Sequence, residues 1–329
     1  MKTLKYLIAG VCASMALTGC LDKFQDLNTD PEQLSSTDPK YVFTGATQNF
    51  DNCSRGHLTG KYSGTMIYMQ YLVSASGPSS GSYISSAKPN NHPEPYSPSY
   101  SYYYSTNGDG FGGFGLRLDY LINSVIPNNN EAERYSNIKA ISQILFSYQQ
   151  WRVLDTYGAA PITEAFRAQD GVKTPRYDLY QNSIDGTPMY KKIDSDVKAA
   201  VETLKRSVDN QFELGTNDFF YSGDVQKWIK FGNTLRVKMA QRLEKADEAF
   251  YSSVVNEVLA SASNIMENNG ESCIYHHPND YNNNTDDIQD ITSRYVASAA
   301  FVNFLKAYCD PRLPILVRRN GFGEGNNNT

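Results

Sequence analysis

Apolar residues recur at steps of three and four along most of the chain, a spacing that places side chains on one face of an α-helix. The strongest stripe predicts a helix over residues 131–156. Gly158 and Pro161 follow it, and both residue types are typical of helix ends. The apolar positions of this stripe are Ile138, Ile141, Leu145, Tyr148, Trp151 and Leu154.

Further helices are predicted on both sides of this stripe. Asp38 and Asp224 are suitable N-cap residues, and Pro39 and Pro188 suit the first turn of a helix. Residues 77–115 are instead rich in proline, serine, tyrosine and glycine, so we expect a long irregular loop there. Without a run of alternating strands, the sequence predicts an all-α fold, an array of helix pairs like tetratricopeptide repeats but without their repeat signature. The other predicted helices cover residues 38–50, 57–73, 187–204, 224–243, 250–265 and 295–308.

The N-terminus has the features of a lipoprotein signal peptide. Two lysines precede an apolar run, Tyr6–Leu17, that is too short to span a membrane. The small residues Thr18 and Gly19 stand directly before Cys20, as in a lipobox, so we expect acylation of this cysteine and anchoring in the outer membrane. An ordinary secretory signal is the alternative. The predicted segments are a signal peptide (1–19), a lipidated tether (20–37) and a helical domain (38–329).

The charge balance narrows the range of partners. The chain has 30 basic and 35 acidic residues, and its net charge of −5 becomes −7 without the signal peptide, which holds two lysines and no acid. We therefore expect no binding to nucleic acid. Cys53, Cys273 and Cys309 remain in the predicted domain; one disulfide is compatible with export, and the sequence does not choose its pair.

Three segments follow the predicted lipobox in a fixed order: residues 154–165 (LDTYGAAPITEA), 228–236 (WIKFGNTLR) and 310–314 (DPRLP). Together with Asn28-Thr29-Asp30-Pro31 in the tether, they resemble the SusD/RagB family of Bacteroidetes outer-membrane lipoproteins. The resemblance implies a lid-like, non-catalytic protein on a TonB-dependent SusC-like barrel, which captures oligosaccharides or peptides for import. Family members usually continue well past the third segment, so we expect the C-terminal part of the family to be missing here.

The residues of these segments also have a structural interpretation. Trp228 and Phe231 are expected in the core, and Asn233 is placed to form a hydrogen bond across helices. Arg312 is expected to form an ion pair with Asp310. We therefore predict that the signature segments form scaffold and that the ligand contacts lie elsewhere.

Tyrosine is the most distinctive residue of this chain, with 24 copies against two tryptophans. Its ring and hydroxyl match the apolar faces and hydroxyl edges of a sugar. The alternative for each ring is that it packs a loop onto the helices. The expected ligand contacts are Tyr83, Tyr96, Tyr100, Tyr102, Tyr103, Asn107 and Asp109, in a stretch that also contains Tyr104, Phe111 and Phe114, and Tyr281 and Asn282 in a second loop.

Two motif matches fail on closer inspection, so no cofactor and no metal are predicted. The second loop spaces its acidic and amide residues like a calcium loop, but Thr285 and Ile291 replace the required glycine and glutamate. Gly110, Gly112 and Gly115 match a dinucleotide-binding fingerprint, but no parallel βαβ unit is predicted around them.

Three function classes remain open. The leading hypothesis is capture of a polar oligomer by tyrosine-rich loops and its delivery to a barrel partner. A glycoside hydrolase on a helical scaffold needs two carboxylates roughly 5–10 Å apart, and no local pattern selects such a pair. A helical scaffold that binds only protein is the third class.

Overall fold

The computed structural model describes residues 38–48, 50, 69–74, 100, 103–104, 113–206, 209–261, 264–276 and 295–317. The expected signal peptide, Cys20 and the tether lie outside these residues. Within the described part of the chain, no helix has both the length and the apolar character needed to cross a bilayer.

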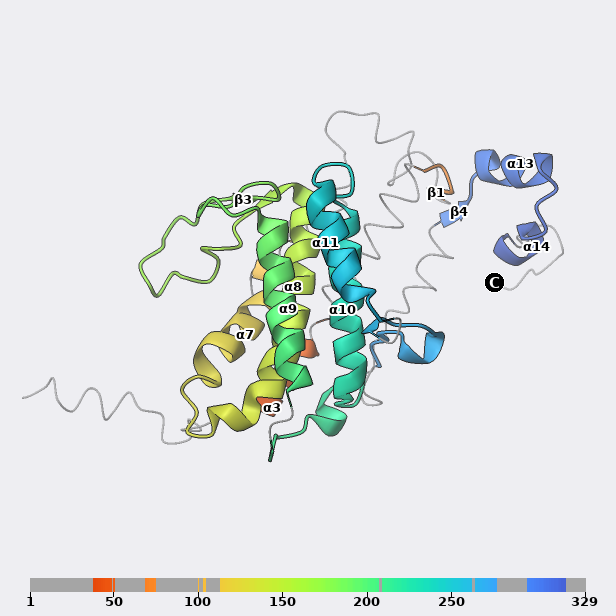
Figure 1. Ribbon diagram of the computed structural model, residues 1–329. Helices are drawn as coiled ribbons and strands as arrows, with labels where there is room; N and C mark the ends of the chain where they lie inside the picture. The colour runs from red at the N-terminus through yellow and green to blue at the C-terminus, as the bar shows by residue number, and fades with distance from the viewer. Residues whose placement is uncertain are drawn as a thin grey trace, which may run out of the picture. The chain divides into compact units, whose positions relative to one another are not determined.

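Four helices form the main body: α8 (Ser136–Tyr157), α9 (Met189–Lys205), α10 (Val225–Gln241) and α11 (Glu248–Val258). Helix α9 packs against both α8 and α10, and α10 also packs against α11 (Figure 1). The predicted all-α class is therefore confirmed. The shorter elements are α3 (Pro39–Thr47), α7 (Phe114–Tyr120), a π-helical segment (Leu121–Val125), α13 (Ala299–Ala307), α14 (Leu313–Leu316), and 3-10 turns at Ala132–Tyr135, Gly215–Asn217 and Asn269–Glu271.

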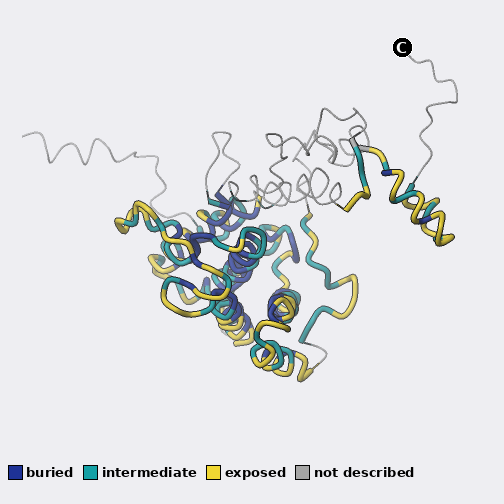
Figure 2. Tube along the Cα trace, turned by 90° about the horizontal axis from the view of Figure 1, so that it is seen from above, coloured by how far each residue is buried: buried dark blue, intermediate teal, exposed yellow. Residues whose placement is uncertain are grey.

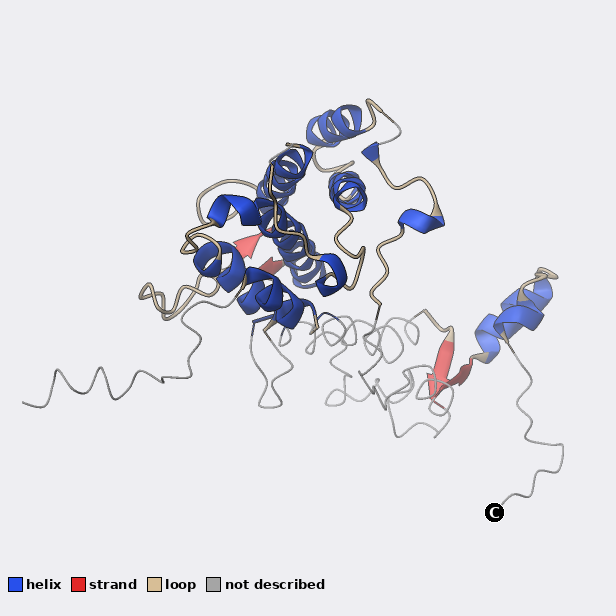
Figure 3. Ribbon diagram, turned by 90° about the horizontal axis from the view of Figure 1, so that it is seen from below, coloured by secondary structure: helices blue, strands red, loops and turns tan. Residues whose placement is uncertain are grey.

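Two short antiparallel strand pairs accompany the helices (Figure 3). β2 (Ala159–Ala160) pairs with β3 (Asp178–Leu179), and β1 (Leu72–Ser74) pairs with β4 (Tyr295–Ala297). The second pair shows that two helix predictions were wrong at one end. Of the helix predicted over 57–73, the described residues 69–73 form a turn and strand β1, and α13 begins only after its N-cap Ser298. The β1–β4 hydrogen bonds join residues more than 200 positions apart, so local periodicity contains no signal for them.

The ends of the long helices follow from their local sequence. The Asp224 carboxylate accepts hydrogen bonds from the backbone N–H groups of Gln226 and Lys227 at 3.0 and 3.2 Å, which confirms its role as the N-cap of α10. Gly158 adopts a left-handed conformation (φ 74°), and its N–H donates to the Leu154 carbonyl at 2.8 Å. This is the helix end predicted at Gly158.

The core lies where the long helices pack together (Figure 2). Trp228 of α10 is fully buried, and its indole N–H donates to the Asp218 carboxylate at 2.8 Å. A Cβ atom on Gly232 would lie 2.6 Å from Val201 and 3.2 Å from Ile144, so glycine lets α10 approach α9 and α8 closely.

A buried ion pair joins α9 to α10. Arg236 and Asp194 are nearly inaccessible to solvent, and the guanidinium donates to the carboxylate at 2.9 and 3.3 Å. Arg236 also donates to Glu257 of α11 at 3.0 Å. Because each charge has partners, this network fixes the three helices against one another.

One buried carboxylate holds the long segment between α8 and α9, residues 158–188. Asp178 accepts hydrogen bonds from the N–H groups of Ile162, Thr163 and Ile184 at 3.0, 2.6 and 2.9 Å, and from the Thr163 hydroxyl at 3.0 Å. These four bonds satisfy a fully buried charge. Residues 161–177 are therefore closed at their base by Asp178 and the β2–β3 pair.

The three signature segments occupy scaffold positions. The Asn233 amide donates to the Asn264 carbonyl at 3.1 Å, and the Arg312 guanidinium donates to Asp310 at 2.9 and 2.6 Å. Both contacts agree with the structural interpretation of these residues. Cys273 and Cys309 are free thiols, and Cys53 lies outside the described residues.

Candidate functional site

Two of the residues predicted to contact ligand, Tyr100 and Tyr103, lie within the described part of the chain. The others lie outside it, and their assignment stays a prediction. These are Tyr83, Tyr96, Tyr102, Asn107, Asp109, Tyr281 and Asn282.

Tyr103 is a core residue in the structure, so its prediction as a ligand contact is corrected. Its side chain is fully buried, and its ring lies against Gly115, where a Cβ atom would come within 2.4 Å of it. The ring also packs edge-on against Tyr104, with 4.6 Å between centroids. Tyr103 therefore packs its segment onto the helices, which was the alternative for each of these rings.

Tyr100 belongs to a group of rings near the C-terminal end of α8. Its ring centroid lies 4.4 Å from that of Tyr104 and 5.4 Å from that of Tyr157. The Tyr104 hydroxyl donates to the Pro161 carbonyl at 2.9 Å, which anchors the group to the end of α8. Tyr177, next to the buried Asp178, completes it and is 61 % exposed. We refer to Tyr100, Tyr104, Tyr157 and Tyr177 as the tyrosine cluster.

The cluster offers neutral hydroxyl groups beside apolar ring faces. Burial, followed by the neighbouring Tyr177 hydroxyl, raises the pKa of Tyr100, and burial also raises the pKa of Tyr104. Both phenols therefore stay protonated at neutral pH and can donate as well as accept hydrogen bonds. Such a surface is chemically suited to sugar rings, and it is also suited to peptide side chains.

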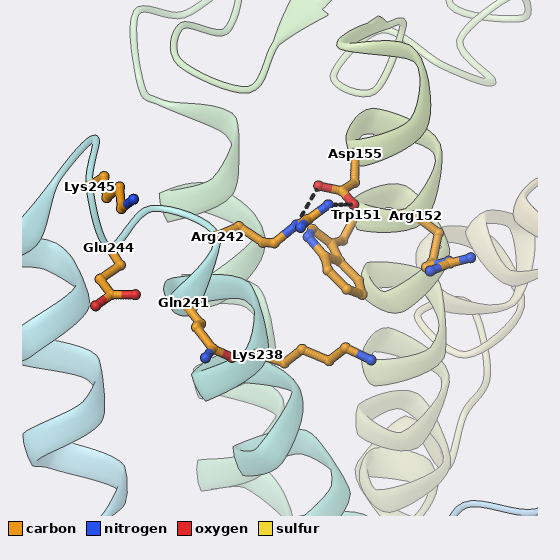
Figure 4. Close-up of a pocket in the computed structure, with 8 residues that line it drawn as sticks. All are labelled: Trp151, Arg152, Asp155, Lys238, Gln241, Arg242, Glu244 and Lys245. Atoms are coloured by element: carbon orange, nitrogen blue, oxygen red, sulfur yellow. Dashed lines mark hydrogen bonds and ion pairs between the residues drawn. The ribbon is translucent and has the colours of Figure 1, made fainter. Parts of the chain in front are cut away.

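A cavity of about 520 Å³ lies between α8 and α10 (Figure 4). No sequence pattern singled it out, because it depends on which faces of the two helices meet. Its lining comes from the last two turns of α8 and from the C-terminal end of α10 with the turn that follows. The lining residues are Trp151, Arg152, Asp155, Lys238, Gln241, Arg242, Glu244 and Lys245, and we call this the α8–α10 pocket.

Lys238 of α10 and Arg242, directly after the end of this helix, reach toward α8 across this pocket, as Figure 4 shows. Arg242 donates to Asp155 at 3.0 and 2.6 Å. Lys238, four residues earlier and thus on the same face of α10, lies with its ammonium 5.8 Å from the centroid of the Trp151 ring. The pocket therefore contains the Arg242–Asp155 ion pair and, one turn earlier on α10, the Lys238 ammonium near the Trp151 ring.

Asp155 is held in its charged form. Partial burial favours the neutral acid, but hydrogen bonds from Arg242 and from the Tyr190 hydroxyl (2.8 Å) outweigh this and lower the pKa of the carboxyl. Burial, followed by the same hydrogen bond to Asp155, raises the pKa of Tyr190. A carboxylate kept ionised in this way is poorly suited to act as a general acid.

Comparison with solved structures shows the fold. A SusD homolog from Bacteroides vulgatus superposes with a TM-score of 0.59 at 17% identity, over 84% of this chain and 53% of that one. A SusD/RagB family protein from Bacteroides thetaiotaomicron gives a TM-score of 0.59 at 19% identity, over 84% and 53%. The structure of a chitin-binding protein gives a TM-score of 0.51 at 20% identity, over 84% of this chain and 54% of that one. The chain thus spans about half the length of the solved structures it matches.

A search of curated proteins gave no match. A family model described as "starch-binding associating with outer membrane" matches residues 31–329, almost all of the chain after the predicted signal peptide. The three signature segments recognised in the sequence fall within this match. The chain belongs to the SusD-like family.

Proposed function

We propose that this protein binds oligosaccharides at the cell surface, without converting them, and delivers them to a TonB-dependent SusC-like transporter. The observation that carries the proposal is the tyrosine cluster, in which the Tyr100 ring packs on Tyr157 of α8 and the exposed Tyr177 side chain lies next to it. Membership of the SusD-like family and the similarity to a chitin-binding protein support a carbohydrate as the ligand.

The binding test uses the mature chain, residues 20–329, titrated with a panel of neutral glycans and peptides in a calorimeter. Tyr100→Ala and Tyr177→Ala each remove one ring of the cluster, and we expect each to weaken glycan binding about fivefold, from a loss of about 1 kcal/mol of ring contact. Tyr120→Ala is the matched control, because Tyr120 is a comparably exposed tyrosine on α7 outside the cluster.

The outcomes separate the site from the function. Unchanged affinity in both cluster variants rejects the tyrosine cluster as the site. If the folded protein binds none of the glycans, the proposed function fails, and binding of peptides alone changes the ligand class. Chromatography of the glycans after prolonged incubation addresses catalysis, since any cleavage product contradicts a purely binding role.

Anchoring and delivery are the remaining parts of the proposal. Acylation of Cys20 is supported by the lipobox, and Cys20→Ala is expected to release the protein from the membrane fraction. Delivery is tested by affinity purification of the tagged protein from its native membrane, with a co-purifying β-barrel as the expected result. A protein that stays membrane-bound without Cys20, or that purifies without a barrel, contradicts the corresponding step.

A further inference from the structure

The α8–α10 pocket is rich in positive charge on an acidic chain. Four cationic side chains line it, against two acidic ones, Asp155 and Glu244, whereas the whole sequence has a net charge of −5. One of the two acids is already engaged, because Asp155 holds Arg242 through two hydrogen bonds. The pocket therefore has cationic groups in excess of the carboxylates available to neutralise them.

Lys238 is the most distinctive of these cations. The Arg242 side chain extends from the end of α10 to α8 and binds a carboxylate there. The Lys238 side chain lies one turn earlier and extends in the same direction, but its ammonium lies near the Trp151 ring. Among the described residues, neither Lys238 nor Lys245 has an ion-pair partner. An ammonium held over an aromatic face in a concave site can bind an anion with little rearrangement.

The volume of the pocket is suited to a small ligand or to one part of a larger ligand. Its volume of about 520 Å³ lies within the usual range of roughly 300–1,000 Å³ for small-molecule sites and is too large for an isolated inorganic anion. Trp151 is only 2 % exposed, so the pocket does not present an open stacking platform of the kind the tyrosine cluster offers. The charged side chains of the lining are therefore the groups most available to a ligand in this pocket.

We propose that the α8–α10 pocket binds the carboxylate or sulfate group of an acidic oligosaccharide, with Lys238 as the main contact. Gln241, which also lines the pocket, can bond to neighbouring hydroxyl groups. Glu244 faces the same cavity and opposes anion binding on its side, so the acidic group sits toward Lys238. This inference rests on the proposed glycan-binding function and assigns it a substrate class.

The experiment compares acidic sugars with matched neutral ones. The mature chain is titrated with tetragalacturonate and its methyl ester, with sialyllactose and lactose, and with a heparin tetrasaccharide, at low and at high salt. We expect at least one acidic probe to bind tenfold or more tightly than its neutral counterpart, and this preference to shrink with added salt. Equal affinity for the acidic and neutral members of every pair, with no binding of the heparin tetrasaccharide, overturns the inference.

Substitutions test whether the preference for acidic sugars depends on Lys238. Lys238→Gln removes the charge and keeps a polar chain of similar size, and we expect it to abolish the preference for acid while leaving the fold unchanged by circular dichroism. Lys173→Gln is the control, because Lys173 is an exposed lysine in the loop between α8 and α9, away from the pocket lining. A preference that survives Lys238→Gln, or is lost in Lys173→Gln, contradicts the assignment.

The results also distinguish this inference from the proposed function. Binding of neutral glycans that depends on Tyr100 and Tyr177, without any preference for acid, leaves the function intact and rejects the acidic site. Tighter binding of a hexaglutamate peptide than of every acidic sugar, lost in Lys238→Gln, assigns the pocket to an acidic protein segment and overturns the substrate class. Absence of all binding by the folded protein removes both proposals.

Discussion

Arg236 of α10 and Arg242, the residue directly after this helix, each bind an aspartate of a neighbouring helix in very different surroundings. The Arg236 and Asp194 side chains are 4 % and 8 % exposed, whereas those of Arg242 and Asp155 are 56 % and 19 % exposed. Loss of one partner inside the core leaves a charge that water cannot reach, and the same loss at the surface leaves a hydrated one. The comparison teaches that burial, and not the pairing itself, decides whether an ion pair fixes the fold or shapes a site.

The largest expected effect is on the buried side. Asp194→Ala leaves Arg236 with only Glu257, and we expect the free energy of unfolding to fall by about 3–5 kcal/mol, measured by urea denaturation. Asp155→Ala is the surface counterpart, and its expected cost is about 1 kcal/mol or less. Equal losses in the two variants contradict the comparison.

A smaller loss of stability is expected when a side chain is added at Gly232, on the buried face of α10. Gly232→Ala forces a methyl group against Val201 and Ile144, and we expect a loss of about 1–3 kcal/mol in the free energy of unfolding. Gly45→Ala is the control, because a Cβ atom there meets no heavy atom closer than 3.9 Å. Alanine also favours helix over glycine by about 1 kcal/mol, so the control variant is expected to be as stable as the parent or more stable. A neutral Gly232→Ala variant means that the three helices pack less tightly than the structure indicates.

The smallest expected effect is a pH dependence at the surface pair. The pKa of Asp155 is lower in the folded state, so its contribution to stability is complete above the unfolded value of about 3.9 and is lost as the pH falls through the folded value. Asp155→Asn is therefore expected to differ from the parent by about 1 kcal/mol or less at pH 7, and this difference shrinks below pH 4. Denaturation curves between pH 2 and 7 measure it, and a difference that grows toward low pH reverses the sign of the assigned shift.

Local patterns were sufficient to predict much of the helical body. The stripe ending at Leu154 became α8, Asp224 capped α10, and Gly158 ended its helix as expected. The β1–β4 pair could not be predicted in this way, because Leu72 and Ala297 meet only after the chain has folded. Tertiary contacts, which periodicity does not encode, decided these ends.

The candidate site was less predictable than the fold. Tyrosine frequency pointed to Tyr100 correctly as part of an aromatic group, but it did not distinguish Tyr103, which is buried against Gly115. Tyr177 was missed because it lies far from the tyrosine-rich stretch in sequence and reaches the cluster only through the segment that Asp178 holds. Lys238 resembled any solvated lysine, since only the packing of α10 on α8 places it beside Trp151.

The four hydrogen bonds on Asp178, together with the Arg167 guanidinium that donates to Asp119 of α7 at 2.8 and 2.9 Å, hold the segment between α8 and α9 against the helices. Gly171 at its exposed turn has a positive φ of 91° and no atom within 4 Å of its Cβ position. A fluorescent label attached at this exposed turn, six residues from Tyr177 in sequence, is therefore expected to change its emission if ligand binds at the tyrosine cluster. The turn at Gly171 is thus a suitable attachment point for a reporter of the proposed binding.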